Sequence, residues 1–233
     1  QLPVEQQNEI AKRQFKNLEK LWARVCALAA KKNCILVFAA GNDDILSSIP
    51  PENRNASSIV VAAVDKNLYP TDFTNYGPCS DISAPGKGIY SSYPHGDFKS
   101  FDGTSMAAPI VSGTIALMKS IKKDLTVEQA RNVLYKTGSD VYGFMPPMVL
   151  VDKVLEGVKR GDFSTPAERT MKTVPDGAGD ESAANRASPI SKAPVENIAS
   201  PPRQKEDETD YDAIRRKIAE YKRKISELEK LLP

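Results

Sequence analysis

The stretch Phe101-Asp-Gly-Thr-Ser-Met-Ala-Ala-Pro-Ile-Val-Ser-Gly113 decides which fold and which chemistry this sequence can support. Gly103 permits a close approach of the backbone, and a helix is expected from about residue 105 to residue 121. A serine at the start of a helix lies beside free backbone N–H groups, which can hydrogen-bond an anion. Ser105 could equally be the N-cap of that helix, which is a far commoner role for serine. Pro109 is expected within the first helical turn, where its missing N–H has no partner to lose.

The segments upstream and downstream of this stretch indicate an α/β fold. Residues 34–39 and 59–64 are continuous apolar runs, which fit strands of a parallel sheet buried on both faces. Residues 5–32 have a helical pattern, and residues 89–93 are expected to pair with residues 98–101 as a hairpin. A further helix is expected at 126–136, because Thr126 and Gln129 form a capping-box pattern.

Composition excludes little and favours no special partner. The 233 residues are 40% hydrophobic and 27% charged with a net charge of +2, so nothing suggests binding to nucleic acid or to an anionic membrane. No apolar stretch approaches the roughly 20 residues that a membrane-spanning helix needs. The first residues do not resemble a signal peptide, and a start at Gln1 suggests a processed or truncated product. Cys26, Cys34 and Cys79 have no metal-ligand spacing, and the first two are expected to be buried.

Three domains are expected along the chain. Residues 1–160 form the α/β part, and residues 161–210, rich in Pro, Ser and charged residues, are typical of a disordered linker. Residues 211–233 form a third, helical segment, in which apolar residues recur in heptad steps from Ile214 to Leu232. About three heptads is marginal for a free helix, so this segment is either an oligomerisation or docking helix or a solvated, partly formed one.

The chemistry-bearing residues carry a family resemblance. Gly103-Thr-Ser-Met-Ala-Ala-Pro109 resembles the nucleophile motif of the subtilisin-like serine proteases, or subtilases. Ala39-Ala-Gly-Asn42, directly after an apolar strand, resembles the oxyanion-hole segment of that family. Phe73-Thr-Asn-Tyr-Gly77 and Asp81-Ile-Ser-Ala-Pro-Gly86 resemble two further family segments, in the expected order. The resemblance covers about residues 20–160.

This resemblance implies a fold and an activity. The fold would be a three-layer subtilisin-like α/β domain with a partial parallel sheet that lacks its N-terminal part. The activity would be that of a serine endopeptidase, which hydrolyses peptide bonds of a polypeptide substrate through an acyl-enzyme on Ser105. Asn42 would donate to the oxyanion, and Ala39, Ala40 and Gly41 would border the substrate pocket. No cofactor is implied. Calcium is common in the family, but no site is assigned in this chain, and relatives of this kind are usually secreted.

One half of the family's machinery has no counterpart in the sequence. The reaction needs a histidine base held by an aspartate, and in this family both precede the oxyanion asparagine. The residues before Asn42 include neither residue type. His95 is the only histidine, and its predicted turn favours an exposed loop residue over a relocated base.

Three hypotheses therefore stand. The chain could be the C-terminal part of a subtilisin-like endopeptidase. It could instead be a catalytically inactive fragment or an interaction protein that acts through its C-terminal helix. In the third hypothesis, another chain supplies the histidine and the aspartate. Residues 1–160 by themselves are expected to be poorly stable or prone to aggregate, because their sheet would have an open edge.

Overall fold

The computed structural model describes residues 4–142 and 145–164. The predicted linker beyond residue 164 and the heptad segment at 211–233 lie outside the described residues. The elements in chain order are α1 (Val4–Gln14), α2 (Lys16–Lys31), β1 (Leu36–Ala39), η1 (Pro51–Arg54), β2 (Ser58–Val64), β3 (Ile82–Pro85), β4 (Ile89–Tyr93), η2 (Pro94–Gly96), β5 (Asp97–Phe101), α3 (Thr104–Ile121), α4 (Val127–Thr137) and α5 (Val151–Arg160).

The sheet that organises the domain is parallel, with the strand order β1-β2-β3. Every residue of the central strand β2 is buried. Ile59, Val61 and Ala63 join one hydrophobic core, whereas the residues between them join another on the opposite face. Burial on both faces explains why β2 is continuously apolar rather than alternating, as the sequence predicted.

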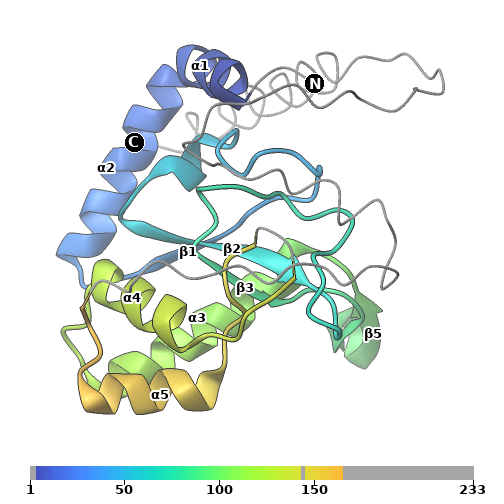
Figure 1. Ribbon diagram of the computed structural model, residues 1–233, viewed down its shortest axis with the longest axis vertical. Helices are drawn as coiled ribbons and strands as arrows, with labels where there is room; N and C mark the ends of the chain where they lie inside the picture. The colour runs from blue at the N-terminus through green and yellow to red at the C-terminus, as the bar shows by residue number, and fades with distance from the viewer. Residues whose placement is uncertain (1–3, 143–144, 165–233) are drawn as a thin grey trace, which may run out of the picture. The chain divides into compact units, whose positions relative to one another are not determined.

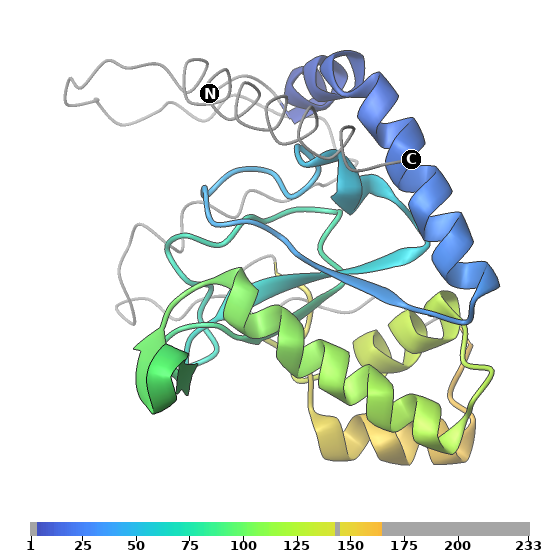
Figure 2. The same cartoon turned by 180° about the vertical axis from the view of Figure 1, so that it is seen from behind.

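Helices cover this sheet in layers (Figures 1 and 2). The long helix α3 packs against all three strands, and α4 and α5 lie on the same side. On the other face, Trp22 of α2 meets Phe38 of β1 edge to face, with ring centroids 5.2 Å apart. The arrangement is the three-layer α/β architecture that the sequence predicted. Helix α3 follows β5 in the chain, begins beside the loop after β1 and runs along the sheet.

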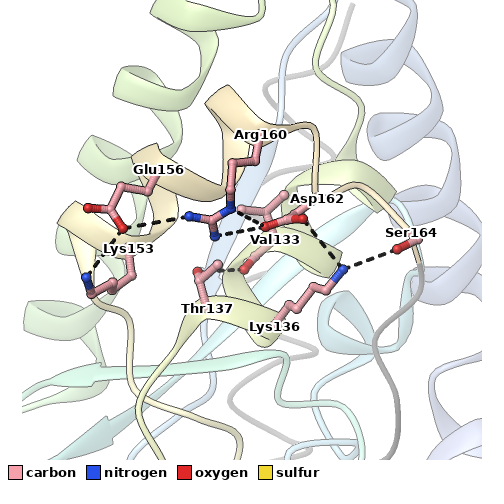
Figure 3. A network of polar contacts seen from close by, with 8 residues as sticks. All are labelled: Val133, Lys136, Thr137, Lys153, Glu156, Arg160, Asp162 and Ser164. Carbon is pink, nitrogen blue, oxygen red and sulfur yellow. Dashed lines mark hydrogen bonds and ion pairs between the residues drawn. The ribbon is translucent and has the colours of Figure 1, made fainter.

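Helices α4 and α5 are joined by the close approach of the Gly157 backbone to side chains of α4 and by charged side chains (Figure 3). A Cβ on Gly157 would lie 2.8 Å from Thr137 Cγ2, so only glycine fits this crossing without a shift. Asp162, just after α5, pairs with Arg160 at 2.9 Å and with Lys136 of α4 at 3.8 Å. These contacts fix the end of the described domain against α4. Neither α5 nor β3 was predicted, because α5 is largely polar with an internal glycine and β3 is short and ends at a proline.

Two other predictions about the elements need correction. The helix predicted at 5–32 is two helices, which are separated at the buried Phe15 (φ −106°, ψ 14°). Cys26 is fully buried as predicted, but Cys34 is exposed. It precedes β1 and follows Asn33, which has a positive φ of 54°, so it lies in the connecting turn rather than in the buried strand.

The two outer strands of the sheet differ in how their edges are covered. Next to β3, Ser83 N donates to Pro147 O and Val149 N donates to Ser83 O, so the segment after α4 runs alongside this strand. Within residues 4–142 and 145–164, no strand pairs with the outer edge of β1, and every residue of β1 is partly exposed. No helix in the described part of the chain is long and apolar enough to span a membrane.

Candidate functional site

Ser105 is the second residue of α3, and its side chain is exposed. The N-cap of this helix is Gly103, so the alternative that Ser105 serves as the N-cap is wrong. Pro109 lies beyond the first turn, not within it as predicted. Its missing N–H therefore leaves the carbonyl of Ser105 without its usual partner four residues on.

Asn42 lies next to this helix start, in the loop that follows β1. Its Oδ1 accepts two hydrogen bonds from Thr104, one from the backbone N–H at 2.9 Å and one from the hydroxyl at 2.8 Å. Because Oδ1 is held in this way, the amide nitrogen Nδ2 must face away from Thr104. Among the described residues, no group accepts a hydrogen bond from Nδ2 or from the N–H of Ser105.

The nitrogens of these two donors both lie near one position, beside Gly103. An ideal Cβ built on Gly103 would lie 3.4 Å from Asn42 Nδ2 and 3.6 Å from the backbone nitrogen of Ser105. Gly103 has a φ of +152°, which other residues rarely adopt, and it adds no side chain at this position, which Met106 Sδ also borders at 3.6 Å. The positive end of the α3 dipole adds to the same field. The arrangement can therefore stabilise negative charge that develops on an oxygen next to Ser105.

Hydrogen bonds inside the protein hold the loop that carries Asn42. The Thr104 hydroxyl, which donates to Asn42, also accepts from the backbone N–H of Gly41 at 3.2 Å. The carbonyl of Ala40 accepts from the side-chain amides of Asn53 and Asn75, and the Ala40 side chain is fully buried. Ala40 and Gly41 thus shape the loop, and the role of Ala39, Ala40 and Gly41 in substrate binding stays a prediction.

His95 lies far from this position along the β4–β5 hairpin. The base of the hairpin is tied to the Ser105 turn, since Gly88 N donates to Asp102 Oδ1 and Gly103 N donates to Gly86 O. His95 is exposed and lies at the opposite end, beyond the Tyr93–Asp97 pair. Four residues of strand at about 3.3 Å each place this tip roughly 13 Å from Phe101. The prediction of an exposed turn residue is confirmed.

Asp81, which begins one of the family-like segments, has a structural role. It accepts from Val60 N at 2.8 Å and from Arg131 Nε at 2.7 Å, and Arg131 also donates to the carbonyls of Ala56 and Ser58. Burial raises the pKa of Asp81, and the neighbouring guanidinium opposes this rise. Burial is also the main cause of the raised pKa of Cys79. Asp81 and Arg131 thus join β2, the start of β3 and α4.

The described residues contain no group of three or more His, Cys, Asp or Glu side chains that could hold a metal ion. Sequence reasoning named Ser105 and Asn42, and the structure brings these two together. It missed Thr104 and Asn75, which hold the Asn42 loop. Thr104 belongs to the stretch Gly103–Pro109 and Asn75 to the stretch Phe73–Gly77. The signal that could have identified them is a polar residue next to apolar residues that are expected to be buried.

An exposed serine beside two N–H donors at a helix start is an arrangement that serine hydrolases can use. The model of the subtilase family matches residues 7–171. This chain belongs to the subtilase family, as the sequence motifs predicted.

This chain matches only part of the length of each individual relative. The chain is 37% identical over 113 residues to subtilisin BL of Lederbergia lenta, which is 48% of this chain and 42% of that protein. It is 33% identical over 148 residues to subtilisin-like protease 1 of Arthroderma gypseum, which is 61% of this chain and 30% of the relative. Among solved structures, the proteases from Pseudoalteromonas arctica PAMC 21717 align with a TM-score of 0.54 at 28% identity, covering 58% of this chain and 46% of theirs. The chain thus spans about half or less of the relatives that it matches.

Proposed function

We propose that this chain supplies the nucleophile and the oxyanion donors of a serine endopeptidase. Ser105 attacks the scissile carbonyl of a polypeptide, and an acyl-enzyme forms on its Oγ. Asn42 Nδ2 and the Ser105 N–H donate to the oxyanion. The observation that carries the proposal is that Asn42 Nδ2 and the Ser105 nitrogen lie near one position beside Gly103, at 3.4 and 3.6 Å from an ideal Cβ on that residue. Ala39, in the strand that leads into this loop, borders the substrate.

The general base is the component that the described residues do not provide. Ser105 needs an imidazole within hydrogen-bond reach to take its proton. His95, the only histidine of the 233 residues, lies at the exposed hairpin tip. We infer that the base comes from polypeptide outside these 233 residues, and no cofactor is assigned to the reaction.

Labelling with a fluorophosphonate probe tests this proposal on the full chain. We expect little labelling in buffer, and labelling at Ser105 when a high concentration of imidazole substitutes for the missing base. Ser105→Ala should abolish it. Ser112→Ala is a matched control, since Ser112 is another exposed serine of α3 whose hydroxyl donates to Ala108 O. Its labelling should be unchanged.

Each other outcome has a definite meaning. Labelling that survives Ser105→Ala would contradict the assignment of the nucleophile. Rapid labelling without imidazole that disappears in His95→Ala would show that His95 is the base. A chain that stays unlabelled even with imidazole would favour the alternative of a catalytically inactive protein.

A further inference from the structure

We propose that Asn75 is a positioning residue for the oxyanion site and acts through Asn42. This inference rests on the proposed function, because it concerns how the same site is held in shape. Asn75 follows β2 in the chain and belongs to the stretch Phe73–Gly77. It is fully buried, and its side chain reaches across to the loop after β1.

The side chain of Asn75 holds the loop on both sides of Asn42. Before Asn42, Asn75 Nδ2 donates to the carbonyl of Ala40 at 2.9 Å. After Asn42, Asn75 Oδ1 accepts from the backbone N–H of Asp43 at 3.0 Å and of Ile45 at 3.2 Å. The side-chain amide of Asn75 thus donates to the loop before Asn42 and accepts from the loop after it. These bonds fix the backbone on both sides of Asn42.

The backbone adds a fourth contact and explains a glycine. Asn75 N donates to Gly41 O at 2.9 Å, directly before Asn42. A Cβ on Gly41 would lie only 2.3 Å from Asn75 Nδ2, and Gly41 has a φ of +109°. Gly41 is therefore required by the close approach of Asn75. The oxyanion loop and Asn75 form one interlocked unit, in which a shift of Asn75 must move the loop.

Asn53 provides a natural contrast. It is also a buried asparagine, and its Nδ2 donates to the same Ala40 carbonyl at 3.1 Å and to Ser47 O at 3.0 Å. No hydrogen bond joins its side chain to residues 41–45 in the described structure. Removing Asn53 costs buried contacts near the loop and leaves the clamp around Asn42 in place.

The test combines reactivity with a direct view of the Asn42 amide. Asn75→Ala and Asn53→Ala are compared in the full chain, with Ser105 labelling rates in imidazole normalised to the folded fraction. Displacement of a reacting group by about 1 Å can cost up to about 100-fold, so we expect Asn75→Ala to lose about 10- to 100-fold. Asn53→Ala should change the normalised rate less than about 3-fold, although both variants lower the melting temperature. Equal losses in both variants would overturn the proposal.

A double-mutant cycle shows whether Asn75 acts through Asn42. In the Asn42→Ala background, Asn75→Ala should cost little further reactivity, because the donor that it positions is already gone. Fully multiplicative losses would contradict the proposal. If Asn75→Ala does not fold, Asn75→Asp serves instead. It keeps the acceptor for Asp43 and Ile45 but places an oxygen where the donor to Ala40 stood, so a loss of reactivity is again expected.

A second readout does not depend on the reaction. In protein with ¹⁵N-labelled asparagine side chains, the Nδ2 resonances of Asn42 should shift or broaden in Asn75→Ala and stay in place in Asn53→Ala. Failure of the proposed function would appear as no labelling of the wild-type chain, with this NMR difference retained. Failure of the Asn75 proposal would appear as an unmoved Asn42 resonance in Asn75→Ala.

Discussion

The hydroxyl of Thr104, together with the backbone N–H of the same residue, determines which way the Asn42 amide faces. It donates to Asn42 Oδ1 and accepts from Gly41 N, so it joins the helix start to the loop after β1. Without this hydroxyl, Asn42 Oδ1 loses one of the two hydrogen bonds that hold it toward Thr104 and so orient the amide.

Thr104→Val should therefore lower the imidazole-supported labelling of Ser105 by about 10-fold, within the range for a misplaced reacting group. It should also reduce the free energy of unfolding by about 1–3 kcal/mol, because the N–H of Gly41 loses its acceptor. Thermal unfolding and labelling rates measure the two effects. Thr114→Val is the control, since Thr114 is also buried in α3 and donates to Ile110 O away from the site. Equal labelling of the two variants would contradict the role of Thr104.

At the scale of elements, the pair Asp81 and Arg131 joins two strands to α4. The carboxylate also accepts from β2, and the guanidinium caps carbonyls before and at the start of that strand. Removing one partner of this partly buried pair leaves the other charge uncompensated, which is costlier than losing both.

Arg131→Met should lower the free energy of unfolding by about 1–3 kcal/mol at neutral pH, because Asp81 loses a charge-assisted hydrogen bond. Burial already raises the pKa of Asp81, and loss of the guanidinium, which lowers it, raises that pKa further. The folded variant then binds the Asp81 proton more tightly than the unfolded chain. Its stability is accordingly best below the ordinary pKa of aspartate and is lost as the pH rises through the raised pKa. Denaturant unfolding from acidic to neutral pH measures this slope, which should be absent in the double variant Asp81→Asn/Arg131→Met.

At the scale of the whole molecule, β1 is the exposed side of the sheet. No strand pairs with its outer edge in the described part of the chain, and apolar side chains are also exposed on α2, where Leu28 is 59% exposed. An open edge of apolar strand favours pairing with another chain.

A fragment of residues 1–164 should therefore associate as its concentration rises, as measured by sedimentation or light scattering. Leu28→Lys should reduce the association without lowering the melting temperature, since Leu28 is largely exposed already. A monomeric fragment with a sharp thermal transition would contradict this prediction.

Local patterns in the sequence predicted many parts of this structure. The buried strand at β2, the hairpin around His95 and the capping box of α4 depend on neighbouring residues, and each was found. The motifs around Ser105 and Asn42 likewise indicated the family, because a long exact pattern is specific. The break at Phe15 and the short strand β3 were missed, since packing against distant residues decides them.

By itself, the sequence determined the class of fold, the family and the two residues expected at the site. Only the tertiary structure decided that Asn42 Nδ2 and the nitrogen of Ser105 lie near one position. It also decided that Thr104 and Asn75 hold Asn42 there and that His95 lies at the far end of a hairpin. The physical reason is that hydrogen bonds between Asn75 and the loop at 40–45 span about thirty residues of chain. No local pattern of residues encodes the direction of a side-chain amide, which depends on the donors and acceptors that folding brings to it.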